Sequence, residues 1–394
     1  MSLIRRTRRR AAASIVLAAA LVATAACSKD SGSNNDTVKL GLLVPLSGVY
    51  KSIGEDMKRG FELYVEQHNN KFGGHKIEVV VADEGEAPGV SLSAATKLVK
   101  QDKVAAVVGV SSGAAVAAIT PMLADNRVPL IGSGGRPNLQ NIDRVWNTSW
   151  MSDETGAAIA KYVKDTVNGP VGIIGPDYQG GQDQIRGFTD TFVKAGGQVA
   201  NSGGKPTFTP WPGTTNFLPY LSQIAQSGAK AVYTFYAGSA AVDFVKQYKQ
   251  SDAKDIPLYA AGFLTEGATL AAEGDAARDI YSVLNYAPGL DNPANRNFVS
   301  AYNAKHKTQP NLYAMCSFDA GSVLDRAITA IDGKVTSEAI NNAIRGLGQI
   351  DSPRGAWQFG ANHSPVQKWY LRQVRPDGQV LSNVVVQELA TLGS

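Results

Sequence analysis

Cysteine and histidine are scarce in this sequence. Its 394 residues include two cysteines, Cys27 and Cys316, and four histidines. No group of His, Cys, Asp and Glu has the spacing of metal ligands, so we expect neither a metal ion nor a cofactor. If Cys27 is lipidated, Cys316 has no partner and no intramolecular disulfide can form.

Charge of one sign is also lacking once the first residues are set aside. The formal charge of +4 includes five arginines within residues 1–26, a segment without an acidic residue. The remaining chain carries 33 basic and 34 acidic residues, a formal charge of −1. Nucleic-acid binding therefore has no support from composition. The charged fraction of 18% is too small for a disordered chain, and the length predicts two domains.

One apolar run, residues 15–22, lies between the arginines and Cys27. It is too short to span a hydrocarbon core of ~30 Å comfortably, so residues 1–26 are predicted to be a secretory signal peptide. The small residues 23–26 before Cys27 are similar to a bacterial lipobox, in which the cysteine receives diacylglycerol. The alternative is an ordinary cleavage site with an incidental cysteine. Residues 27–37 are polar and predict a flexible tether.

From residue 38, short β-rich runs alternate with amphipathic helical segments. Strands are expected at 38–44, 77–81, 104–108, 128–131, 171–174, 231–236 and 256–260. This alternation is typical of parallel strands joined by crossover helices. In the tail, residues 368–374 are expected to pair with residues 379–386. We predict an α/β protein with two parallel sheets and a ligand cleft at the carboxyl ends of the strands.

Two turns rich in glycine and serine follow predicted strands. The first consists of Ser111, Ser112 and Gly113, and the second of Ser133, Gly134, Gly135 and Arg136. The first turn opens a helix, so its main-chain N–H groups can hold a carboxylate. The glycines of the second allow a ligand close to the main chain. Arg136 can bind an anion or form a surface salt bridge. We expect these turns, on facing sheets, to converge on an anion.

Residues 109–113 also match the G-x-S-x-G nucleophile elbow, with Ser111 as the nucleophile. Asp319 and His363 are the only candidates for the acid and the histidine of a triad. A glycine-serine turn is common between a strand and a helix, so we expect no enzyme and keep a serine hydrolase as an alternative.

Aromatic residues follow several of the predicted strands. They are Trp150, Tyr178, Tyr236 and Phe263. Taken singly, each is more often a packing residue. Together at strand ends they would line a pocket for a flat apolar group with one polar end.

Residues 40–48 read LGLLVPLSG, and Gly73-Gly74, Asp83, Pro88 and residues 107–109 follow in a similar spacing. With these motifs the chain resembles the periplasmic Leu/Ile/Val-binding family, type I solute-binding proteins that feed ABC importers. The resemblance implies two Rossmann-like lobes joined by a three-strand hinge and closed on a ligand. It also implies delivery of that ligand to a membrane permease.

The resemblance implies roles for individual residues as well. The ligand carboxylate would meet Ser111 or Ser112 and the main chain of residues 133–136. The family's acidic partner for a ligand ammonium falls on Phe263, with Glu266 the nearest acid.

A tyrosine of the family falls on Ile53, and several aromatic-acid binders look similar around Trp150 and Tyr178. An aromatic acid and a branched-chain amino acid are therefore nearly equal candidates for the ligand.

We therefore expect a lipoprotein on the outer face of the cell membrane, anchored by Cys27, that captures a small carboxylate for an ABC permease. One lobe would comprise residues 38–150 and 287–358, the other residues 151–286 and 359–394. Besides the hydrolase, a sensory subunit for a membrane kinase is the alternative.

Overall fold

The structure is a computed structural model that describes residues 37–393. The expected signal peptide, Cys27 and the tether up to residue 36 lie outside the described residues. Within residues 37–393, no helix combines the length and the apolar character needed to cross a membrane.

Six strands form the first sheet, in the order β2-β3-β1-β4-β5-β7. Their bounds are Val38–Val44 (β1), Lys71–Phe72 (β2), His75–Asp83 (β3), Ala106–Gly109 (β4), Leu130–Gly132 (β5) and Val145–Asn147 (β7). The strands run parallel except for β2, which is antiparallel to β3. Leu42 and Leu43 of β1 belong to different buried clusters, because successive side chains of a strand point to opposite faces. Both faces of this sheet must therefore be covered.

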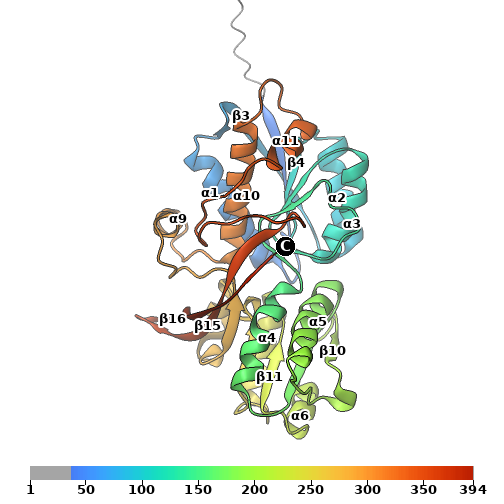
Figure 1. Cartoon of the computed structure of the whole chain (residues 1–394), viewed down its shortest axis with the longest axis vertical. Helices are drawn as coiled ribbons and strands as arrows, with labels where there is room; N and C mark the ends of the chain where they lie inside the picture. The colour runs from blue at the N-terminus through green and yellow to red at the C-terminus, as the bar shows by residue number, and fades with distance from the viewer. Residues whose placement is uncertain (1–36, 394) are drawn as a thin grey trace, which may run out of the picture. The chain divides into compact units, whose positions relative to one another are not determined.

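Helices cover both faces (Figure 1). The helices are Lys51–Gln67 (α1), Pro88–Lys100 (α2), Gly113–Asp125 (α3), Leu312–Thr329 (α10) and Ser337–Ile344 (α11). α1 contacts α10 on one side, and α2 contacts α3 on the other. Phe61 of α1 shares a cluster with Leu42, and Leu98 of α2 shares one with Leu43. Residues from the distant segment 312–344 thus complete the first sheet.

The second sheet has the strand order β10-β9-β11-β12-β13-β15-β14, with β16 paired to β15. Its strands are Val171–Asp177 (β9), Thr207–Pro210 (β10), Ala231–Thr234 (β11), Leu258–Ala261 (β12), Tyr281–Leu284 (β13), Gln358–Phe359 (β14), Pro365–Asp377 (β15) and Val380–Leu392 (β16). Strands β9 to β13 are parallel, whereas β15 is antiparallel to β13 and β16. Gln373 lies opposite Val384, so the predicted pairing of the tail is confirmed.

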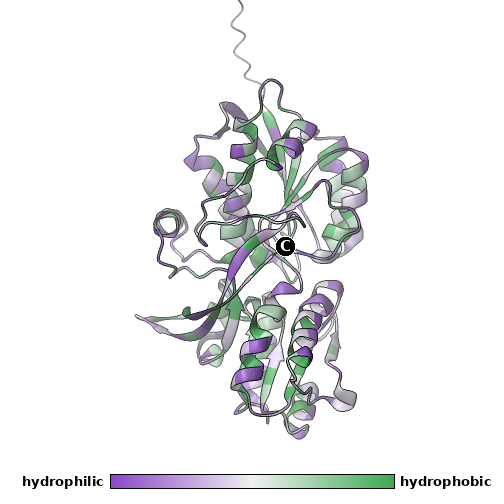
Figure 2. Ribbon diagram, in the orientation of Figure 1, coloured by the Kyte–Doolittle hydropathy of each residue, from purple (hydrophilic) through white to green (hydrophobic). Residues whose placement is uncertain are grey.

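Amphipathic helices flank the second sheet. They are Glu154–Thr166 (α4), Gln179–Lys194 (α5), Leu218–Gln226 (α6), Gly238–Gln250 (α7) and Ala268–Glu273 (α8), with 3-10 turns at Ser202–Gly204 (η1), Gly262–Thr265 (η2) and Gly274–Ala277 (η3). Helix α9 spans Pro293–His306, and the short strands Gly135–Arg136 (β6) and Trp150–Met151 (β8) pair with each other. In Figure 2 the strands between the helices are mostly hydrophobic, whereas α4 and α5 carry both colours. The predicted α/β fold with parallel sheets is confirmed.

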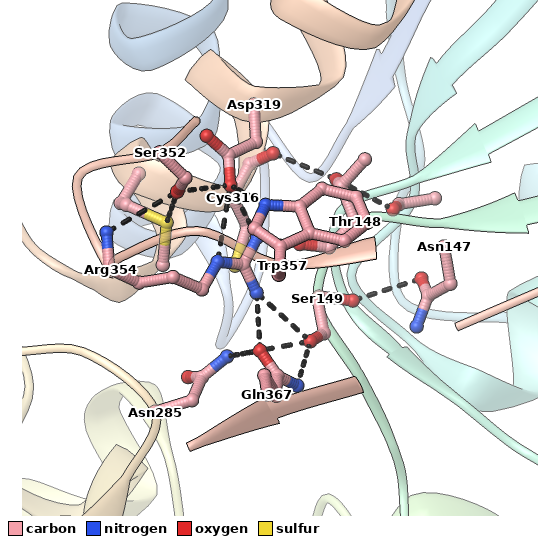
Figure 3. Close-up of polar contacts among 12 residues, drawn as sticks. Asn147, Thr148, Ser149, Asn285, Cys316, Asp319, Ser352, Arg354, Trp357 and Gln367 are labelled. Carbon is pink, nitrogen blue, oxygen red and sulfur yellow. Dashed lines mark hydrogen bonds and ion pairs between the residues drawn. The ribbon is translucent and has the colours of Figure 1, made fainter. Parts of the chain in front are cut away.

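The chain passes between the sheets three times: after β7, after β13, and between α11 and β15. Arg354 of the third passage connects them (Figure 3). Its guanidinium donates to the Ser149 carbonyl of the first passage and to Gln367, which also accepts from Asn285 of the second. Asp319 of α10 accepts from Arg354 Nε at 3.1 Å. Both charged side chains are buried, so each depends on the other for its charge partner.

Candidate ligand-binding cavity

A cavity lies where strands of both sheets end. It contains about 430 Å³ that no protein atom occupies, a volume that includes open solvent. Elements of the first sheet, with β6 and the segment around β8, contribute Tyr50, Ile53, Ser111, Gly113, Gly135, Trp150, Ser152 and Tyr313. Elements of the second sheet contribute Tyr178, Gly180, Gln184, Phe235, Ala237 and Phe263. Open α/β sheets bind ligands at this edge.

Aromatic rings dominate the lining. Phe263 lies among them, with ring centroids 4.9 Å from Trp150, 5.6 Å from Phe235 and 6.1 Å from Tyr313. The hydroxyls of Tyr50 and Tyr178 share a hydrogen bond of 2.6 Å, which joins the start of α1 to the start of α5. Such a wall can enclose a flat apolar group.

Among the described residues that line the cavity, none is Asp, Glu, Lys, Arg or His. Glu266, the nearest acid to Phe263 in the sequence, does not face the cavity. Its carboxylate pairs with Arg372 at 2.9 Å and accepts the Leu312 N–H at 2.8 Å. Both oxygens of Glu266 therefore have partners in the protein, one in a buried ion pair and one at a main-chain N–H, and neither is directed to a ligand ammonium.

Hydrogen-bond donors gather at one part of the cavity. Trp150 Nε1 is buried and has no partner within the described residues. A methyl group added at Gly135 would lie 3.0 Å from this nitrogen and 3.3 Å from Ser152 Oγ, and one at Gly113 would lie 3.6 Å from Ser152 Oγ. Gly113 is the first residue of the 13-residue helix α3, whose first N–H groups have no partner inside the helix. Uncharged donors beside a helix N-terminus favour an anion.

The second sheet adds one unsatisfied polar side chain. Gln184 of α5 lines the cavity, is buried, and has no hydrogen-bond partner for Oε1 among residues 37–393. An amide can both donate and accept, so it can bind a polar substituent of a ligand.

A buried carboxylate, which the sequence did not reveal as part of the site, occupies the turn before α3. Glu84 accepts the main-chain N–H groups of Ser111 at 2.7 Å and Ser112 at 2.9 Å, and the Ser111 hydroxyl at 3.3 Å. Burial raises the pKa of Glu84 to about 7, although these hydrogen bonds oppose the shift. The expectation that the Ser111 and Ser112 N–H groups hold the ligand is therefore wrong, because Glu84 already uses them. The signal available in the sequence was the acidic pair Asp83-Glu84 at the end of β3.

The two glycine-serine turns do converge, but they follow β4 and β5, which are neighbours in one sheet. The prediction of facing sheets is wrong. Gly134 packs on the Val110-Ser111 main chain, where a methyl group would lie 2.4 Å from the Val110 carbonyl oxygen. This contact turns Gly134 away from the cavity and leaves only Gly135 of the second turn in the lining.

Four other predicted residues have partners outside the cavity lining. Ser133 accepts a hydrogen bond from Ser317 at 2.9 Å. The Arg136 guanidinium is buried and donates to Ser364 Oγ at 3.1 Å and to the Asn362 carbonyl, so it is neither an anion ligand of the cavity nor a surface salt bridge.

Ser112 occupies the N-cap position of α3, where its main-chain N–H donates to Glu84. Tyr236 shares a hydrogen bond with Thr209 at 3.0 Å inside the second sheet's core. Phe235 and Tyr236 follow β11 directly, and the alternation of side chains continues past the strand end. Tyr236 therefore joins the buried cluster of Val232, and Phe235 faces the cavity.

Several lining residues were not predicted: Tyr50, Ser152, Gly180, Gln184, Phe235, Ala237 and Tyr313. Tyr50 and Tyr313 stand at the starts of α1 and α10. No strand-end pattern marks them, and only the packing of these two helices brings them to the site.

The residues of the alternative triad do not meet. Ser111 Oγ donates to Glu84, and Asp319 is paired with Arg354. His363 binds the Ile142 carbonyl through Nδ1 at 2.9 Å and stacks on Trp146. A hydrolase with this set of residues has no geometric support.

Comparison with known proteins finds relatives over most of the chain. The family model described as periplasmic binding protein matches residues 37–379. The chain is 29% identical over 353 residues to the Leu/Ile/Val-binding protein homolog 6 of Brucella melitensis, covering 87% of this chain and 89% of that protein.

Two solved structures of ABC-transporter solute-binding proteins from R. palustris are similar. One, in complex with benzoate, has 30% identity and a TM-score of 0.80, covering 89% of this chain and 97% of that chain. The other, in complex with 4-hydroxybenzoate, has 27% identity and a TM-score of 0.82, and the match covers 90% of this chain and 98% of that chain.

Proposed function

Since the chain belongs to the periplasmic binding protein family, we propose that it is the solute-binding protein of an ABC importer and that its ligand is a small aromatic carboxylate. The observation that carries the proposal is the cavity lining, which combines aromatic rings and uncharged donors with no acidic side chain. The R. palustris relatives that bind benzoate and 4-hydroxybenzoate support it.

In the proposed complex, the carboxylate lies at the first turn of α3. It accepts hydrogen bonds from Trp150 Nε1 and Ser152 Oγ, and Gly113 and Gly135 leave room for its oxygens. The ring lies against Phe263 and Phe235. Gln184 is available to a polar ring substituent.

A branched-chain amino acid is the second candidate, because the relative from Brucella melitensis is named for Leu, Ile and Val. Its α-ammonium would need a partner in the cavity, and the lining offers none that is charged. Burying an unpaired ammonium costs several kcal/mol, of which a cation–π contact returns ~1–2 kcal/mol. The balance favours an acid without an amine.

Matched ligand pairs test this preference. Thermal shift and calorimetry would compare 3-phenylpropanoate with phenylalanine and 4-methylpentanoate with leucine, with benzoate and 4-hydroxybenzoate alongside. We expect the acids without an amine to raise the melting temperature by several degrees at roughly a hundredfold excess over Kd. Preference for leucine over 4-methylpentanoate would contradict the proposal.

A variant sharpens the same test. Phe263→Glu places a carboxylate at the expected position of the amine, so we expect weaker benzoate binding and a gain for leucine. Phe263→Leu is the control, because it also shortens the aromatic wall but adds no charge. If both variants bound leucine more tightly than the wild type, the size of the ring rather than the added charge would determine the ligand preference.

The same proposal covers the location and the two lobes. We propose two lobes that close on the ligand, one formed by residues 38–150 with 287–358 and the other by residues 151–286 with 359–394. We also propose that Cys27 carries a lipid anchor and that a permease receives the ligand.

The anchor is tested by a substitution: Cys27→Ser should move the protein from the membrane to the soluble fraction. Mass spectrometry of the wild-type N-terminal peptide should show a diacylglycerol modification, and an unmodified peptide would refute the anchor.

A further inference from the structure

Glu84 stands where the proposed ligand needs positive potential. Its carboxylate accepts two successive main-chain N–H groups and a hydroxyl at the start of α3. Its side chain is 1% exposed. Of the residues it contacts, Ser111 also lines the cavity, and Gly113, the second residue after it, does so as well.

No cation balances this carboxylate, since Glu84 forms no ion pair with any described Lys, Arg or His within 4.0 Å. The titratable groups that affect Glu84 or stand beside it are Asp83 and Glu86 on its own segment and Tyr50 at the start of α1. The cations of adjoining segments have other partners: Arg136, in the turn that packs on Ser111, donates to Ser364 and Asn362, and Lys51, next to Tyr50, lies 3.9 Å from Glu55. The charged group named among the causes of the Glu84 pKa shift is Asp83, which is acidic.

A ligand carboxylate at Gly113 would add a second negative charge beside the first. In a buried site two carboxylates a few ångströms apart repel strongly, and the cheapest response is for one of them to take up a proton. The ligand is held by Trp150 and Ser152, whereas Glu84 has no positive partner. Glu84 is the group that should become neutral.

We propose that Glu84 couples ligand binding to proton uptake, so that the site binds an anionic ligand together with one proton on Glu84. This inference rests on the proposed function, because it requires an anion at the start of α3. Protonated Glu84 keeps one oxygen as an acceptor for an N–H group and loses its repulsion toward the ligand. Glu84 thus acts as a positioning residue that makes affinity depend on pH.

The pKa of Glu84 supports this coupling. Burial already raises it to about 7 in the free protein, so protonation costs little near neutral pH. An added like charge raises the pKa further, and binding then takes up protons. At pH 7 we expect uptake of about half a proton per ligand, and a Kd that rises roughly tenfold from pH 6 to pH 8.

Calorimetry of the whole mature protein with benzoate and 4-hydroxybenzoate tests the inference. Measuring at pH 7 in two buffers of different ionisation enthalpy gives the number of protons taken up. Both ligands remain ionised from pH 6 to pH 8. Proton uptake in the wild type that vanishes in Glu84→Gln supports the proposal. The matched control is Glu86→Gln, which changes an exposed carboxylate that caps the Val49 N–H and should keep the uptake.

Ser111→Ala provides a second measurement in case Glu84→Gln does not fold. It removes one hydrogen bond that stabilises ionised Glu84, so the pH of maximal uptake should move upward. Binding without proton uptake, uptake that persists in Glu84→Gln, or a pH maximum unmoved by Ser111→Ala would overturn the inference and leave the proposed function standing. Absence of binding by every acid tested would instead refute the proposed function.

Discussion

The two sides of the cavity differ in chemistry. The side built from the first sheet and β8 offers the helix N-terminus at Gly113, the Trp150 N–H and the Ser152 hydroxyl. The side built from the second sheet offers Phe235, Ala237 and Phe263, with Gln184 and the Tyr178 hydroxyl as polar groups. The difference indicates that one side recognises the anion and the other encloses the apolar body. Substitutions on the two sides should therefore have different consequences.

Filling the anion side should have the largest effect. Gly135→Val adds atoms within 3.0–3.3 Å of Trp150 Nε1 and Ser152 Oγ, so we expect at least about a hundredfold weaker binding of benzoate by calorimetry. Gly213→Ala is the control, because nothing lies within 4 Å of its added methyl group. Unchanged affinity in Gly135→Val would place the carboxylate elsewhere.

Removing one donor while keeping the ring should have a smaller effect. Trp150→Phe removes the unsatisfied N–H and preserves an aromatic surface beside Phe263. A lost hydrogen bond to a charged group predicts about tenfold weaker binding of benzoate. Benzamide, which is neutral, should lose less, and an equal loss for both ligands would mean that Trp150 contributes packing alone.

The smallest expected effect comes from a substitution at a buried carboxylate. It compares Glu84, beside the start of α3, with Glu273 on α8. Glu84 has three donors, whereas both carboxylate oxygens of Glu273 on α8 are buried without a partner among residues 37–393. Burial raises the pKa of Glu273 to about 9. Its folded pKa lies above the unfolded value, so stability is lost as the pH rises toward 9. We expect Glu273→Gln to raise the melting temperature by a few degrees at pH 8 and to change it little at pH 4. An equal change at both pH values would point to packing.

Part of the cavity lining could be predicted from the sequence. Gly113 and Ser111 could be predicted because they follow a strand and open a helix, a local pattern that fixes where N–H groups are free. Phe263 could be predicted because it follows a strand of the second sheet. These features depend on short segments of chain, and the fold then places their strand ends at one edge.

Other parts could not be read from local pattern. The alternation of side chains decides that Phe235 rather than Tyr236 faces the cavity, and one residue of register reverses that choice. Glu84 lies 27 positions before Ser111. Its hydrogen bonds to the start of α3 can form only because β3 and β4 lie on either side of β1.

The residues alone determined the α/β architecture, since hydrophobic periodicity and turn chemistry act over a few positions. Tertiary structure alone decided which donors remain free for a ligand. Hydrogen bonds from Ser111 to Glu84 and from Arg136 to Ser364 join distant segments, and a buried polar group must take whichever partner the packing brings within reach.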